Sequence, residues 1–94
     1  MKKVNVFGLN VPVKRVDRVG EDDDLGEYKD GEILISNKVS KKDFMTVLLH
    51  ECFHAVSHRL GYRQAIDSGE EEIIADSFAT FLVENFDIKA KRVK

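Results

Sequence analysis

Two histidines four residues apart, His50 and His54, lie inside a stretch whose apolar residues recur at helical spacing. Ser40, followed by Asp43, resembles a capping box and predicts that a helix begins near residue 41, while Gly61 predicts that it ends near residue 60. Residues i and i+4 of a helix lie one above the other on one face, so both imidazoles would point to the same place. One side of this helix therefore carries polar side chains and another side packs into the core.

A second helix is predicted over residues 69–85. Ser68 and Glu71 repeat the capping pattern, and three consecutive acids from Glu70 to Glu72 suit the positive end of a helix dipole. Large apolar residues at helical spacing predict its core-facing side. They are Ile73, Ile74, Phe78, Phe81, Leu82 and Phe86.

The sequence before residue 37 predicts strands. Valines alternate with polar or turn residues at positions 4, 6, 11 and 13, and residues 8–10 could turn the chain between two short strands. Pro12 indicates an edge position or a strand start, because proline has no amide to donate. Asp30-Gly31 separates two strand-like runs, 25–29 and 32–36, and predicts a hairpin, since both turn residues tolerate positive φ.

These elements predict one α+β domain over residues 1–94, in which a small antiparallel sheet (about 2–36) packs on helices 41–60 and 69–85. The composition is 43% hydrophobic and 34% charged, which is typical of a soluble globular protein. The net charge of −2 gives no electrostatic case for binding nucleic acid or an anionic membrane. A single cysteine and the lack of a long apolar run predict the cytoplasm. The oligomeric state stays open.

The segment His50-Glu51-Cys52-Phe53-His54 has the pattern H-E-x-x-H. Two imidazoles on one helix face can hold one ion, and imidazole is a good zinc donor. Glu51 projects beside the same place, where it could take a proton from a metal-bound water. The pattern therefore predicts a zinc site, with His50 and His54 as ligands and Glu51 as general base.

A catalytic zinc needs a third protein ligand and one open position. His58 is eight residues from His50, about 12 Å along a straight helix, which is too far to share an ion. Cys52 points away from the histidines and suits a core position. Glu72 in the second helix remains, and Asp76, one turn later, could accept the second N–H of either imidazole. The alternative is ordinary surface histidines beside an acidic first turn.

The two segments together resemble the ImmA/IrrE-type metallopeptidases. The family pairs H-E-x-x-H with a later E-x-x-A-N-x-F-A segment, and the matching positions here are Glu72, Ala75, Phe78 and Ala79, with Asp76 where the family usually has Asn. Asp at that position is also found in thermolysin-like gluzincins. The resemblance covers roughly residues 26–85 and implies a minimal zincin-like catalytic core. It also implies a mobile-element or phage setting and a regulatory protein as substrate.

The predicted activity is hydrolysis of a peptide bond by a water that zinc activates, with a protein or peptide as substrate. An extended substrate is expected along the strand 33–36. Tyr28, His58, Tyr62 and Arg63 are the candidates for contact with the substrate or transition state. Two alternatives stay open: a zinc-stabilised protein-interaction module without turnover, and hydrolysis of a non-peptide amide.

Overall fold

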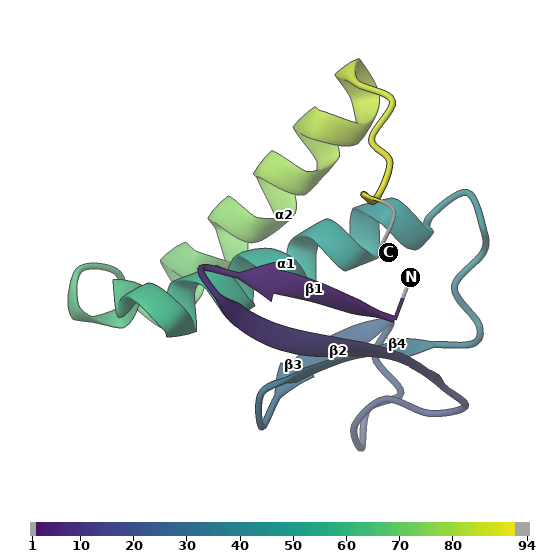
Figure 1. Ribbon diagram of the computed structural model, residues 1–94, viewed down its shortest axis with the longest axis horizontal. Helices are drawn as coiled ribbons and strands as arrows, with labels where there is room; N and C mark the ends of the chain where they lie inside the picture. Colours follow the sequence, from purple (N-terminus) through teal and green to yellow (C-terminus); the bar gives the residue numbers. More distant parts are fainter. Residues whose placement is uncertain (1, 92–94) are drawn as a thin grey trace.

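The computed structural model describes residues 2–91, which form a four-stranded sheet and two long helices (Figure 1). In chain order the elements are β1 (Lys3–Val6), β2 (Leu9–Val16), β3 (Gly26–Lys29), β4 (Glu32–Ser36), α1 (Phe44–Leu60), a short 3₁₀ helix (Tyr62–Gln64) and α2 (Ser68–Asn85). Helix α1 lies between the sheet and α2. The predicted α+β class is confirmed.

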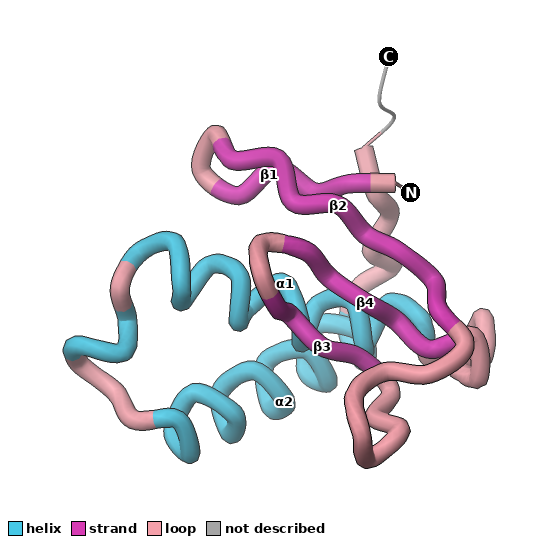
Figure 2. The backbone as a smooth tube through the Cα atoms, turned by 90° about the horizontal axis from the view of Figure 1, so that it is seen from below, coloured by secondary structure: helices cyan, strands magenta, loops and turns pink. Residues whose placement is uncertain are grey.

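The sheet has the strand order β1-β2-β4-β3 and is mixed, whereas the sequence predicted an antiparallel sheet. The hairpins β1–β2 and β3–β4 are antiparallel, but β2 and β4 pair in parallel, with Val13 opposite Ile33 and Val16 opposite Ser36. The reason is the connection: residues 17–25 lead from β2 into β3, and the tight hairpin then returns β4 in the direction of β2 (Figure 2).

Strand β2 changes neighbours halfway along its length. Residues Leu9 to Pro12 pair with β1, and Val13 to Val16 pair with β4. β2 lies between β1 and β4 in the strand order, but the half that contains Pro12 is paired on one side only, which agrees with the edge position that Pro12 indicated. Pro12 is tolerated because it lies where no β4 residue is opposite it and no ladder amide is required there.

Both hairpin turns use positive φ angles. Asp30 and Gly31 have φ of 53° and 79°, as the Asp-Gly prediction required. The first turn is made by Phe7 and Gly8, with φ of 49° and 87°, and so begins one residue earlier than predicted. Leu9 and Asn10 belong to β2.

The hydrophobic core lies between the sheet and α1. Alternate residues of the strands point into it and are almost completely shielded from water, as the period-2 pattern of a half-buried sheet requires. Leu48 and Ala55 close it from the helix side. The buried residues of this core are Val6, Val11, Val13, Ile33, Ile35, Val39, Leu48 and Ala55.

The helix starts differ from the predicted ones. α1 begins at Phe44, because Ser40 Oγ accepts a hydrogen bond from the Asp43 amide and closes a separate turn before the helix. Its end at Gly61, with φ of 72°, is confirmed. In α2 the capping box is formed one residue earlier than predicted, by Asp67 and Glu70. Glu71 takes no part in this capping box.

The buried side of α2 also differs from the predicted side. Glu71, Ala75 and Ala79 are its buried residues, whereas most of the large apolar residues predicted to face the core are exposed. Small side chains let two helix backbones approach closely. The N-terminal half of α2 therefore lies against α1, and the C-terminal end of α2 diverges from α1 (Figure 1). This close approach places the first turns of α2 beside His50 and His54.

Within residues 2–91, neither helix combines the length and the apolar character needed to cross a bilayer.

Candidate metal centre

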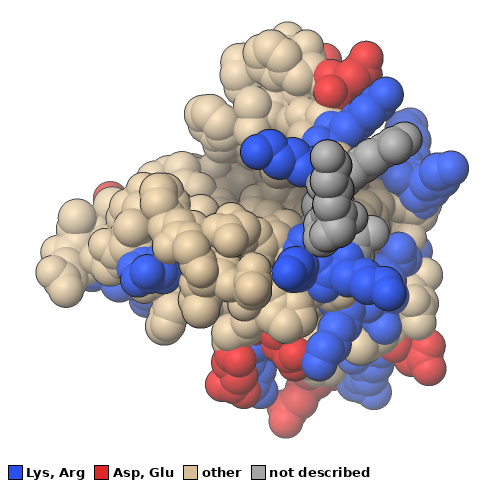
Figure 3. Space-filling view, viewed as in Figure 1, with Lys and Arg blue, Asp and Glu red and all other residues tan. Residues whose placement is uncertain are grey.

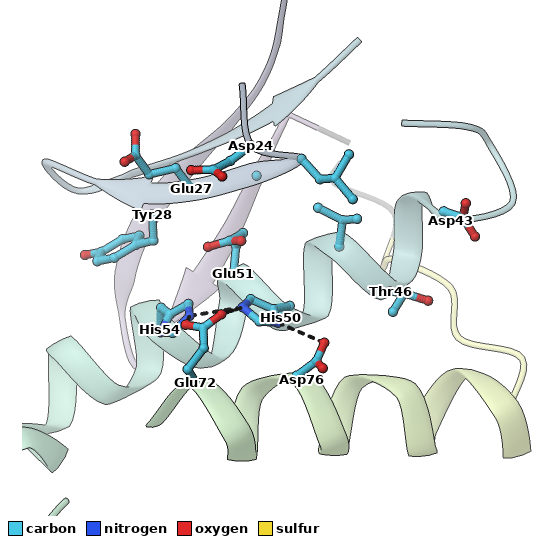
Figure 4. A pocket seen from close by; sticks show the side chains of 13 residues that line it. Asp24, Glu27, Tyr28, Asp43, Thr46, His50, Glu51, His54, Glu72 and Asp76 are labelled. Atoms are coloured by element: carbon cyan, nitrogen blue, oxygen red, sulfur yellow. Dashed lines mark hydrogen bonds and ion pairs between the residues drawn. The ribbon is translucent and has the colours of Figure 1, made fainter. Parts of the chain in front are cut away.

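Three side chains from two helices bring their ligand atoms together. His50 Nε2 and His54 Nε2 lie 3.2 Å apart, as the i, i+4 spacing on α1 predicted. From α2, Glu72 Oε1 lies 2.8 Å from His50 Nε2, and Glu72 Oε2 lies 3.0 Å from His54 Nε2 (Figure 4). Among the described residues, this trio has ligand atoms that all lie within 4.8 Å of one another.

The spacing of the three side chains suits a tetrahedral metal. Ligands about 2.05 Å from a tetrahedral ion are about 3.3 Å from each other, and the distances here are 2.8 to 3.2 Å. Two neutral imidazoles and a carboxylate are a donor set that zinc accepts. The side chain of Glu72 is 60% exposed, whereas those of His50 and His54 are 17% and 18% exposed. One side of the group therefore opens toward solvent, where a fourth ligand would bind.

The outer nitrogen of each imidazole faces a carboxylate. His54 Nδ1 lies 2.5 Å from Glu71 Oε2, and His50 Nδ1 lies 3.7 Å from Asp76 Oδ1. Asp76 thus lies beside His50 as expected, at a separation longer than a hydrogen bond, and its side chain is 78% exposed. A carboxylate at Nδ1 favours the tautomer whose Nε2 is free to bind a metal.

Glu71 is the site residue that the sequence analysis missed. It is buried, and it accepts hydrogen bonds from both His54 and the Ser57 hydroxyl. Burial alone would raise the pKa of Glu71, but these two hydrogen bonds, with the nearby Arg63, outweigh it and hold the pKa below its usual value. A weak signal existed in the sequence, since Glu71 shares the i, i+4 series of Ala75 and Ala79 that faces α1.

Glu51 points from α1 toward β3, into the same cavity as the three candidate ligands (Figure 4). Glu51 is only 6% exposed to solvent. Burial raises the pKa of Glu51, while the neighbouring imidazoles of His50 and His54 and the backbone N–H of Tyr28 oppose the increase. A buried carboxylate with a raised pKa beside a metal site has the properties of a general base.

Gly26 lets β3 approach α1 closely at this point. A Cβ atom built on Gly26 would lie 2.8 Å from Val47 Cγ1 and 3.1 Å from both Cγ and Oε2 of Glu51. Any side chain there would have to displace Val47 or Glu51, so the glycine keeps Glu51 in its position under the strand.

The other candidates lie away from the ligand cluster. Cys52 packs against the core and is not part of the ligand cluster, and burial raises the pKa of its thiol to about 11. His58 is exposed, with its ring 5.8 Å from that of Tyr28, and the Tyr62 ring lies 6.0 Å from that of Phe53. Neither His58 nor Tyr62 is among the residues that line the cavity, and their contact with a substrate stays a prediction.

The cavity has a volume of about 600 Å³ and lies between β3, α1 and α2. Tyr28 is the one predicted substrate-contact residue that lines it. Six carboxylates and no lysine or arginine occur among its described lining residues. The six are Asp24, Glu27, Asp43, Glu51, Glu72 and Asp76.

Comparison of the chain with protein-family models, with curated proteins and with solved structures found no match. The resemblance to ImmA/IrrE-type peptidases therefore rests on the two helical motifs. The geometry of the site does not depend on this resemblance. It brings two imidazoles, a carboxylate and the buried Glu51 around one cavity.

Proposed function

We propose that this chain is a zinc-dependent metallopeptidase that hydrolyses peptide bonds with Glu51 as its general base. The observation that carries the proposal is the convergence of His50, His54 and Glu72 on one point. Glu51 lines the same cavity. The ImmA/IrrE resemblance implies in addition a regulatory protein as substrate. The proposal keeps a cytoplasmic location, because the single cysteine cannot form an intrachain disulfide.

Each residue has a separate task in this proposal. A zinc ion bound by the three ligands would polarise the scissile carbonyl and lower the pKa of a water molecule. Glu51 takes the proton from that water and passes it to the leaving amine. Glu71 holds the ring of His54 through Nδ1, so that Nε2 faces the metal position.

Strand β3 is the place where an extended substrate would pair, in correction of the expected strand 33–36. β4 lies between β2 and β3, so neither of its edges is free, whereas β3 is at the edge of the sheet. The Ser36 amide donates to the Leu25 carbonyl, and backbone groups alternate in direction along a strand. The Gly26 N–H and the C=O groups of Gly26 and Tyr28 therefore face outward, where main-chain pairing with a peptide is possible, while the Tyr28 N–H is directed to Glu51.

The acidic lining indicates a preference for basic peptides. Asp24 precedes β3, Glu27 lies in it, and Asp43 lies near the N-terminal end of α1, so carboxylates line the cavity around the metal position (Figure 4). Opposite charges in a partly enclosed cleft attract a substrate and lose strength as salt screens them.

We expect zinc-loaded protein to cleave a peptide with Lys or Arg beside the scissile bond at least about 10-fold faster, in kcat/KM, than the same peptide with Glu there. The advantage should shrink when ionic strength rises, because the Debye length falls. The double variant Asp24→Asn/Glu27→Gln should reduce this preference for the basic peptide further. Equal rates for both peptides at low salt would contradict the acidic lining as a determinant of substrate choice.

Hydrolysis that depends on a bound metal is the test of the proposed function. The zinc-loaded chain is incubated with a mixture of peptides, and new termini are identified by mass spectrometry. We expect cleavage to stop when a chelator removes the metal and to return when zinc is added back. Cleavage that persists without metal would refute the proposal.

The main alternative is a zinc-stabilised interaction module without turnover. A purely structural zinc is closed by four protein ligands, whereas here three side chains converge and one side opens to solvent. Such a module also has no need of a buried carboxylate beside the metal position, where Glu51 lies. These two features favour an enzyme. Activity screening with amide substrates separates peptide hydrolysis from hydrolysis of a non-peptide amide.

A further inference from the structure

Helix α2 and its extended C-cap residue Phe86 expose a row of large apolar side chains. Ile73, Ile74, Phe78, Phe81 and Phe86 are 68%, 39%, 55%, 51% and 56% exposed, and we call these five residues the α2 patch. The ring centroids of Phe78 and Phe81 are 6.0 Å apart, and those of Phe81 and Phe86 are 6.3 Å apart. The three aromatic rings therefore form a continuous apolar surface rather than scattered single residues.

The α2 patch carries no charge of its own. Within the span of the patch, from Ile73 to Phe86, the ionisable residues are Asp76, whose carboxylate lies beside His50 in the metal centre, and Glu84 near the C-terminal end of α2. Lysine and arginine side chains gather instead around the chain ends, while the surface over α2 is mostly uncharged (Figure 3). An uncharged apolar row offers nothing to a charged partner, but it is complementary to an identical row.

The area of the α2 patch agrees with a small homodimer. Large apolar side chains of this kind bury about 150–250 Å² each, and at these exposures the five residues offer roughly 500 Å². Two copies together would bury roughly 1,000 Å² of apolar surface, and the polar rim would bring the total to the lower end of specific interfaces, about 1,200 Å². A second copy of the chain is therefore enough to cover the patch.

We propose that the protein forms a homodimer through antiparallel packing of α2 against α2 of a second copy. Positions 73 and 81 are equally distant from Ser77, so a two-fold axis at Ser77 sets Ile73 of one copy opposite Phe81 of the other. The small Ser77 side chain allows the helices to approach closely at the axis.

The dimer leaves both metal centres open. Phe81 follows Glu72 by nine residues, about two and a half helical turns, so the two side chains point to opposite sides of α2. The interface and the candidate metal centre thus use different faces of one helix. The dimer does not depend on the proposed enzymatic function, and it can be tested without an activity assay.

Sedimentation equilibrium of the full chain, from about 1 to about 200 µM, tests the dimer. We expect the wild type to reach a mass of twice 10.7 kDa within this range. Phe81→Glu places a charge opposite Ile73 on each side of the two-fold axis and should raise the dissociation constant at least about 100-fold. Phe78→Glu is a second variant with the same expectation. Unchanged far-UV circular dichroism shows that each variant is folded.

Phe7→Glu is the matched control. Phe7 is 63% exposed but lies in the β1–β2 turn, outside the α2 patch, so this variant should dimerise like the wild type. A wild type that remains monomeric throughout the range overturns the proposal, even if another protein binds α2. A folded Phe81→Glu variant that still dimerises with wild-type affinity also overturns it.

Discussion

Glu51→Gln is expected to abolish peptide hydrolysis while the metal stays bound. The amide has nearly the same shape as the carboxylate and fits under β3 at Gly26, but it cannot accept the proton of the attacking water. General-base catalysis typically contributes about 10²–10⁴-fold, so kcat/KM of the zinc-loaded variant should fall by at least this factor. The measurement compares kcat/KM and zinc content of the wild type and the variant side by side.

Glu27→Gln is the matched control for Glu51→Gln. Glu27 also lines the cavity, but it lies on β3 and is not among the residues that converge at the metal position. We expect this variant to hydrolyse a neutral peptide at nearly the wild-type rate. If Glu51→Gln binds zinc and retains wild-type activity, Glu51 is not the base.

Three consecutive glutamates at the start of α2 should differ sharply in their effect on zinc affinity. Glu72→Gln removes the anionic ligand, and Glu71→Gln weakens the hold on the His54 ring. Glu70→Gln changes only the capping box with Asp67. Loss of a carboxylate that orients a ligand typically costs about 10–100-fold in metal affinity, and loss of the ligand itself should cost more.

Competition with a chromophoric chelator measures the dissociation constant of zinc for each of these variants. We expect the zinc affinity to be lowest in Glu72→Gln, intermediate in Glu71→Gln and close to that of the wild type in Glu70→Gln. Because the three substitutions make the same chemical change at neighbouring positions, a general loss of negative charge would affect them alike. Equal zinc affinity in Glu72→Gln and Glu70→Gln would remove Glu72 from the ligand set.

Local patterns in the sequence predicted most of the secondary structure. Asp30-Gly31 and Gly61 take positive φ angles where expected, and α1 and α2 lie within a few residues of their predicted ranges. The proximity of His50 and His54 was also predictable from local structure, because residues four apart lie on one face of a helix. Such features need no knowledge of the rest of the fold.

Features that depend on long-range packing were not predicted. The parallel pairing of β2 with β4 arises from how two hairpins join, and no local signal in either strand specifies it. The apolar row of α2 was assigned to the core, although Ala75 and Ala79 are the residues that pack against α1. Apolar periodicity indicates which side chains avoid water, but it does not identify what covers them.

Glu71 shows the same limit at the site. In the sequence it belongs to an acidic first turn, where a favourable interaction with the helix dipole explains it fully. Only the packing of α2 on α1 brings it next to His54 and Ser57. The candidate ligands were predictable because they follow a motif, whereas the position of Glu71 beside one of them depends on tertiary structure.

X-ray absorption spectroscopy of the zinc-loaded protein tests the central claim most directly, because it reports the atoms around the metal. We predict one zinc per chain with four nitrogen or oxygen neighbours at about 2.0–2.1 Å, two of them imidazoles whose signals disappear in His50→Ala and His54→Ala. A sulfur neighbour at about 2.3 Å, or a zinc spectrum unchanged when both histidines are replaced, would contradict the account.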